Sequence, residues 1–121
     1  LTGKTRNLIG VKEFEMMRAD ALIVNTARGG IVNEADLYDA LEAGRVAGAA
    51  IDVFDKEPYS GRLEKLDQCL LTAHMGSMSV DCRSRMEREA TEEAIRFISD
   101  SKLLSPVPDS EYLNQATFGI G

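Results

Sequence analysis

Residues 22–54 have the sequence LIVNTARGGIVNEADLYDALEAGRVAGAAIDVF, and this stretch decides the fold. Two short apolar runs, 22–27 and 47–54, lie on either side of a segment with helical spacing at 34–43. Short apolar runs bounded by glycine or polar residues are typical of buried strands in a parallel sheet. The stretch therefore predicts a strand–helix–strand unit in which the two strands are parallel.

The helix expected at 34–43 has recognisable start and stop signals. Asn33 is a suitable N-cap, and Glu34 and Asp36 fall in the first turn, where the helix dipole favours acids. Gly44 stands where a C-cap glycine belongs. The apolar stripe that would face the sheet consists of Leu37, Ala40 and Leu41.

Further elements follow outward from this unit. Residues 11–18 have helical spacing, 69–73 are typical of a third strand, and a helix of about 20 residues begins near Ser79. One face of that helix carries Cys82, Met86, Ala90, Ala94 and Phe97, with Ile98 beside them. The fold class is α/β: part of a doubly wound (Rossmann) parallel sheet, with three strands, flanking helices and a long C-terminal helix. We place one domain at 1–102 and an extended tail at 103–121.

Three strands are few for a doubly wound sheet. If the apolar strand at 22–27 were left at a bare edge, it would be an aggregation hazard. The chain also begins with Leu1 rather than Met. We therefore expect a fragment of a longer protein, in which strand 22–27 is covered by further polypeptide or pairs with another chain.

The composition excludes several classes of protein. The net charge of −6 argues against nucleic acid as a partner, because phosphate binding needs a basic surface. No run reaches the roughly 18 apolar residues of a membrane span, and no signal peptide opens the chain. The two cysteines, Cys69 and Cys82, are expected to be reduced, and no Cys/His spacing suggests a metal. We expect a cytoplasmic protein that binds neither nucleic acid nor a membrane.

The residues that can carry chemistry follow the predicted strands. Arg28 comes after the first strand, Glu57 after the second, and His74, the one histidine, after the third. Ligands of open α/β sheets bind at the carboxyl ends of the strands, so these groups can converge. Histidine transfers protons near neutral pH, a neighbouring carboxylate favours the imidazolium, and arginine matches a carboxylate. The set suits proton-coupled hydride transfer on a 2-oxo or 2-hydroxy acid, and it suits other chemistry too.

Each of these residues also has a purely structural interpretation. His74 can be a satisfied structural histidine, Arg28 a surface ion-pair partner, and Glu57 a turn residue before Pro58. Asp52 is less usual, because an acid inside an apolar run is costly unless it is paired or lies at the strand end. We expect Asp52 to have a functional or a capping role.

At this point the sequence becomes specific. Residues 25–58, NTARGGIVNEADLYDALEAGRVAGAAIDVFDKEP, resemble the signature region of the D-isomer-specific 2-hydroxyacid dehydrogenases, which include phosphoglycerate, glycerate, formate and D-lactate dehydrogenases. The opening LTGKTRNLIG is similar to the loop before that region, and LLTAHMGSMS, residues 70–79, is similar to the family's histidine motif. The resemblance covers residues 1 to about 100 and implies the C-terminal half of a nicotinamide-binding domain.

The resemblance implies roles for particular residues. Arg28 would bind the substrate's carboxylate and carbonyl oxygen, Glu57 would pair with His74, and His74 would be the general acid in reduction and the general base in oxidation. Asp52 would lie near the nicotinamide carboxamide. The nicotinamide pocket would be lined by Thr26, Ala27, Arg28, His74, Met75, Gly76 and Ser77. The family further implies NAD, with NADP left open, a small 2-hydroxy or 2-oxo acid as substrate, and a homodimer.

The chain departs from the family pattern in two ways. Ala73 stands where the family usually has proline before the histidine. The chain also lacks the GxGxxG that cradles the pyrophosphate and the acid that holds the adenosine ribose. We therefore expect the isolated chain to have no dehydrogenase activity. Two other interpretations remain open at this stage: a non-catalytic, corepressor-like binding module that keeps the fold, and an inactive truncation.

Overall fold

The computed structural model describes residues 1–109, which fall into two units. The first unit is Leu1–Met75 and the second begins at Gly76. The predicted domain at 1–102 spans both units, and its boundary stays a prediction. Residues 103–108 of the expected tail form neither helix nor strand. The rest of that expectation, 110–121, lies outside the described residues.

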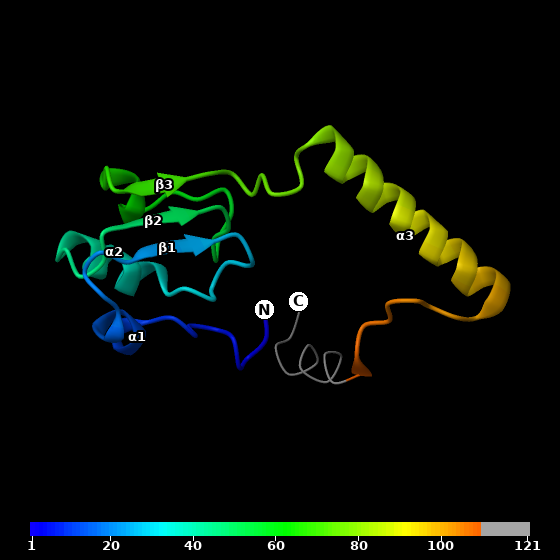
Figure 1. Ribbon diagram of the computed structural model, residues 1–121, viewed down its shortest axis with the longest axis horizontal. Helices are drawn as coiled ribbons and strands as arrows, with labels where there is room; N and C mark the ends of the chain where they lie inside the picture. Colours follow the sequence, from blue (N-terminus) through cyan, green and yellow to red (C-terminus); the bar gives the residue numbers. More distant parts are fainter. Residues whose placement is uncertain (110–121) are drawn as a thin grey trace. The chain divides into compact units, whose positions relative to one another are not determined.

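The first unit is built around a parallel sheet (Figure 1). Its strands are β1 (Leu22–Asn25), β2 (Gly48–Ile51) and β3 (Cys69–Leu71), in the order β1-β2-β3. Leu22 is in register with Gly48, and Ile51 with Leu71. The predicted α/β class and parallel strands are confirmed. The strands are shorter than the predicted apolar runs, and the residues beyond them form the loops that carry the site.

The first unit contains α1 (Val11–Met16), α2 (Glu34–Glu42) and a short 3-10 helix, η1 (Arg62–Lys65). Helix α1 ends two residues before the predicted end at residue 18, whereas the start and stop signals predicted for α2 are confirmed. Asn33 caps α2, because its side chain accepts hydrogen bonds from the backbone N–H of Ala35 and Asp36. Gly44 has φ +64°, and the turn after α2 is closed by bonds from Gly44 N to Leu41 O and from Arg45 N to Ala40 O. This is a Schellman motif, in which glycine avoids the cost of a left-handed backbone.

The core lies on one face of the sheet. Its buried side chains include Ile51 from β2, Leu37 and Leu41 from α2, Phe14 from α1 and Leu63 from η1. The opposite face of the sheet carries Leu22, Val24 and Leu70, which are 72%, 70% and 64% exposed. Within the first unit, no helix therefore covers this apolar face. That further polypeptide or another chain covers it stays a prediction.

The second unit contains one long helix, α3 (Val80–Asp100). Ser79 caps it by accepting a hydrogen bond from the backbone N–H of Cys82, which confirms the predicted start. Its described residues include no buried side chain, and Met86, Phe97 and Ile98 are exposed. Cys69 of the first unit and Cys82 of this one are both free. Among residues 1–109, no helix is both long enough and apolar enough to cross a membrane.

Candidate active site

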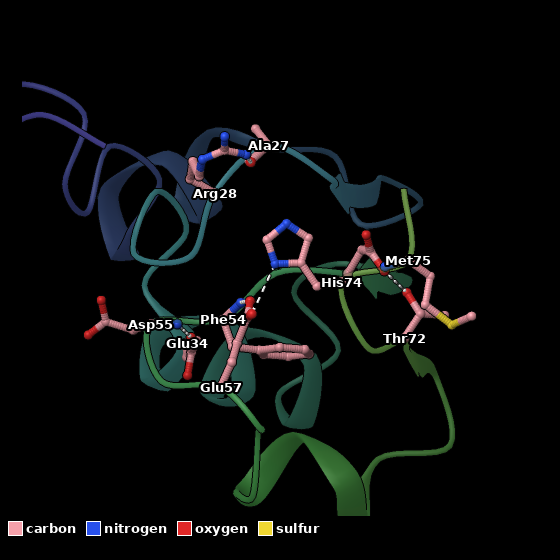
Figure 2. A network of polar contacts seen from close by, with 10 residues as sticks. Ala27, Arg28, Glu34, Phe54, Asp55, Glu57, Thr72, His74 and Met75 are labelled. Carbon is pink, nitrogen blue, oxygen red and sulfur yellow. Dashed lines mark hydrogen bonds and ion pairs between the residues drawn. The ribbon is translucent and has the colours of Figure 1, made fainter. Parts of the chain in front are cut away.

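The candidate site lies on the three loops that follow the strands of the first unit. Arg28 is on the loop after β1, Glu57 on the loop after β2 and His74 on the loop after β3. Parallel strands place these loops at one edge of the sheet. Figure 2 shows the imidazole of His74 with Glu57 on one side and the Arg28 loop on the other. The structure thus brings Glu57 and His74 together, whereas the Arg28 side chain is bonded within its own loop.

His74 and Glu57 form a hydrogen-bonded pair. Nδ1 of His74 lies 2.9 Å from Oε2 of Glu57, and Oε1 of Glu57 accepts from the backbone N–H of Phe54 at 3.0 Å. These bonds, the one to His74 first, hold the pKa of the Glu57 carboxyl below its ordinary value of 4.5. An ionised carboxylate only accepts, so Nδ1 carries the proton of this bond. Figure 2 shows Nε2 directed away from Glu57, toward the side where Arg28 lies.

The backbone of His74 is left-handed, with φ +53°. This conformation costs a non-glycine residue about 1–2 kcal/mol, so the surrounding contacts must hold it. His74 N donates to the backbone oxygen of Asp52 at 2.8 Å, and Met75 N donates to Oδ1 of Asp52 at 2.8 Å. Thr72 Oγ1 donates to the same oxygen at 2.5 Å. Asp52 is 7% exposed, so a buried acid caps the turn that presents His74.

Asn25 holds the Arg28 loop through side-chain hydrogen bonds. The sequence analysis did not predict a role for this residue. Asn25 is 6% exposed. Its Nδ2 donates to Arg28 O at 3.1 Å, and its Oδ1 accepts from Ala27 N at 3.2 Å. An asparagine that closes an apolar strand and turns the following backbone is typical of an Asx-turn, and that signal was present in the sequence. The same turn ends β1 before residue 27.

The Arg28 side chain itself folds back on its loop. Its Nη1 donates to the neighbouring Ala27 O at 2.7 Å, and the residue is exposed. Gly29, next in the chain, packs closely on the loop after β2. A Cβ atom on Gly29 would lie 1.8 Å from Phe54 O. The glycine therefore permits close approach of the two loops, whereas Gly30 supplies a positive φ of +75°.

A cavity of about 550 Å³ adjoins the His74–Glu57 pair. Its apolar lining includes Leu71 and the stacked rings of Phe54 and Tyr59, whose centroids are 4.3 Å apart. Burial raises the pKa of the Tyr59 hydroxyl. The size and the mixed lining are typical of a site for a small organic ligand.

The remaining predicted cofactor residues are distributed over both units. Thr26, Ala27 and Met75 are exposed on the loops of the first unit. Gly76 and Ser77 belong to the second unit, and their role stays a prediction. No cluster of three or more His, Cys, Asp or Glu side chains that could hold a metal ion occurs in residues 1–109.

The sequence matches a known family over most of its length. Residues 1–76 match the model of the D-isomer specific 2-hydroxyacid dehydrogenase, NAD binding domain. Glyoxylate reductase 1 of Saccharomyces cerevisiae is 39% identical over 110 residues, which are 90% of this chain and 31% of that protein. D-3-phosphoglycerate dehydrogenase of Archaeoglobus fulgidus is 42% identical over 98 residues, which are 79% of this chain and 19% of that enzyme.

Solved structures agree with this assignment. A glyoxylate reductase from Paecilomyes thermophila is similar with a TM-score of 0.85 and 35% identity, over 91% of this chain and 34% of that one. An NADPH-dependent glyoxylate/hydroxypyruvate reductase from Sinorhizobium meliloti, in complex with NADP and malonate, gives 0.82 and 30%, over 88% and 34%. The chain thus spans about a third of the length of these reductases. It belongs to the D-isomer-specific 2-hydroxyacid dehydrogenase family, within the NAD-binding domain.

Proposed function

We propose that the chain is part of an oxidoreductase that transfers a hydride between NAD(P) and a D-2-hydroxy acid or 2-oxo acid. The observation that carries this proposal is the 2.9 Å contact between His74 Nδ1 and Glu57 Oε2 at the carboxyl ends of parallel strands. A histidine oriented by a carboxylate, with its second nitrogen directed outward, is arranged for proton transfer. A purely structural histidine does not need that arrangement.

In reduction, C2 of the 2-oxo acid receives the hydride and the carbonyl oxygen receives a proton from Nε2 of the His74 imidazolium. In oxidation, neutral Nε2 takes the hydroxyl proton while C2 gives up the hydride. Glu57 remains ionised throughout, because its pKa is lowered. It keeps the proton on Nδ1 and stabilises the positive ring. The pair thus supplies the proton that balances the hydride in either direction.

Arg28 is proposed to bind the substrate's carboxylate and carbonyl oxygen. A guanidinium offers two parallel N–H groups that match a carboxylate. In the structure one of its nitrogens is bonded to Ala27 O instead, at 2.7 Å. Substrate binding would exchange this single bond to an uncharged carbonyl for a two-point pair with a carboxylate of opposite charge.

The exposed loops fit the nicotinamide end of the cofactor. When bound, the nicotinamide supplies or takes the hydride. Thr26, Ala27 and Met75 stand exposed beside Arg28 and His74, and Gly76 and Ser77 follow in the chain. The hydrogen bonds of Asp52 to Thr72 and Met75 are internal to the first unit, so its proposed place near the carboxamide rests on the resemblance. The family model names NAD and a similar reductase is NADPH-dependent, so we propose NAD or NADP. The homodimer and the cytoplasmic location stay predictions.

A chimera tests the proposal. The matching 110 residues of the Saccharomyces glyoxylate reductase would be replaced by this chain, and oxidation of NADH and NADPH followed with glyoxylate and hydroxypyruvate. We expect turnover by the chimera and none by the 121-residue chain alone. His74→Gln should lower kcat by about a thousandfold, since general acid–base catalysis contributes factors of this order. Glu57→Gln should also lower it, whereas Glu15→Gln, an exposed position on α1, should not. A folded chimera that is inactive, or indifferent to His74→Gln, would sink the proposal.

A further inference from the structure

We propose that Thr72 is a positioning residue for His74 and that it acts through the carboxylate of Asp52. The inference rests on the proposed function insofar as it gives His74 a proton to move. The geometry behind it involves a side chain to which the proposed mechanism gives no part.

One residue, Asp52, holds the chain on both sides of the His74 peptide. Its backbone oxygen accepts from His74 N, and its Oδ1 accepts from Met75 N, both at 2.8 Å. Thr72 Oγ1 donates to that same Oδ1 at 2.5 Å. The hydroxyl therefore helps to hold Oδ1 in the direction in which it accepts from the Met75 amide. Without the hydroxyl, Oδ1 loses one of these bonds, and the bond to Met75 N is less well aligned.

Hydrogen bonds matter more than packing in this turn. Residues 72–75 are all exposed, so few buried contacts restrain them. The φ of His74 is +53°, a conformation that persists only where surrounding contacts impose it. The direction of the imidazole, and hence its bond to Glu57, depends on that backbone.

The simpler interpretation is that Thr72 only continues the β3 ladder. Its backbone N–H does donate to Ile51 O at 3.0 Å. That bond belongs to the main chain and survives any side-chain replacement except proline. The hydroxyl contact with Asp52 is separate, so the two interpretations predict different results for valine and serine at this position.

The test uses the 121-residue chain, in which His74 is the one histidine, so labelled imidazole nitrogens need no assignment. Two-dimensional 15N–1H spectra would give the tautomer of the neutral ring, and hydrogen exchange would give the protection of the Met75 amide. We expect the Nδ1–H tautomer in the wild type. Thr72→Val should shift the ring toward a tautomer mixture and speed Met75 exchange at least about fivefold. Thr72→Ser, which keeps the hydroxyl, should restore both.

The outcomes separate this inference from the proposed function. A folded Thr72→Val chain with the wild-type tautomer and wild-type Met75 exchange overturns the role of Thr72. If valine prevents folding, Thr72→Ala compared with Thr72→Ser decides the same question. Glu57→Ala, which removes the acceptor of the Nδ1 bond, should abolish the tautomer preference and leave Met75 exchange within about twofold of the wild type. If the tautomer preference persists in Glu57→Ala, the acid–base pair of the proposed function is contradicted. The Met75 exchange rates of the Thr72 variants still test the role of Thr72.

Discussion

The loop that carries His74 and the loop that carries Arg28 leave the two strands on either side of β2, and each depends on a buried polar side chain. Asp52 holds the His74 turn through hydrogen bonds with Thr72, His74 and Met75, and Asn25 holds the Arg28 loop through bonds with Ala27 and Arg28. The side chains differ more than the backbones do. His74 is already bonded to Glu57, whereas Arg28 is bonded to the carbonyl beside it. His74, the proposed proton-transfer group, is thus already bonded to its partner carboxylate. Arg28, the proposed anion-binding group, is bonded within its own loop.

The largest expected effect comes from a substitution that forces the loop after β1 away from the loop after β2. Gly29→Ala would place a Cβ 1.8 Å from Phe54 O, and a backbone atom cannot move away as a flexible side chain can. We expect a loss of about 3 kcal/mol in the free energy of unfolding, measured in urea. The matched control is Gly44→Ala, which meets no atom within 4 Å and should cost about 1 kcal/mol for its positive φ. Equal losses at the two glycines would show that the loops do not depend on close contact.

The second test compares the two buried polar residues directly. Asp52→Ala removes a charged acceptor and leaves Met75 N and the Thr72 hydroxyl without it, which should cost about 2–3 kcal/mol. Asn25→Ala removes neutral bonds and should cost about 1–2 kcal/mol. Urea unfolding measures both, with exposed Asp67→Ala as the control. A larger loss at Asn25 than at Asp52 would reverse the comparison.

The third test concerns pH and the His74–Glu57 pair. The pKa of Glu57 is lowered in the folded chain, so its contacts stabilise the fold above the ordinary value of 4.5. That contribution is lost as pH falls through the folded pKa, below 4.5. We expect the difference in Tm between wild type and Glu57→Gln to be present at pH 6 and to shrink below pH 4.5. A difference that stays constant down to pH 3 would mean that the carboxylate is not the origin of the effect.

Much of this arrangement was readable in the sequence, and particular residues explain what was not. Asn33, Gly44 and Ser79 gave the helix boundaries correctly, because capping is local chemistry. The apolar runs located the strands but not their ends, since Val53 and Phe54 are buried beyond the hydrogen-bonded ladder.

Only part of the candidate site could be predicted from the sequence. The convergence of Glu57 and His74 follows from parallel strands, whereas the contact of Thr72 depends on loop geometry that no sequence period encodes. The Asx-turn of Asn25 did have a sequence signal, because asparagine at the end of an apolar run is typical of such a turn. The turn back of Arg28 onto Ala27 has no sequence signal.

The smallest expected effect on stability belongs to Arg28. Its side chain is exposed and bonded within its own loop, so Arg28→Lys should change the free energy of unfolding by less than about 0.5 kcal/mol. Lysine keeps the charge but loses the fork that binds a carboxylate at two points. In the chimera, KM for the 2-oxo acid should therefore rise about tenfold. Arg18→Lys, an exposed arginine paired with Asp20, is the matched control. If instead the free energy of unfolding fell and KM did not change, Arg28 would be a structural residue like Asp52. The proposed difference between the Arg28 loop and the His74 loop would then be wrong.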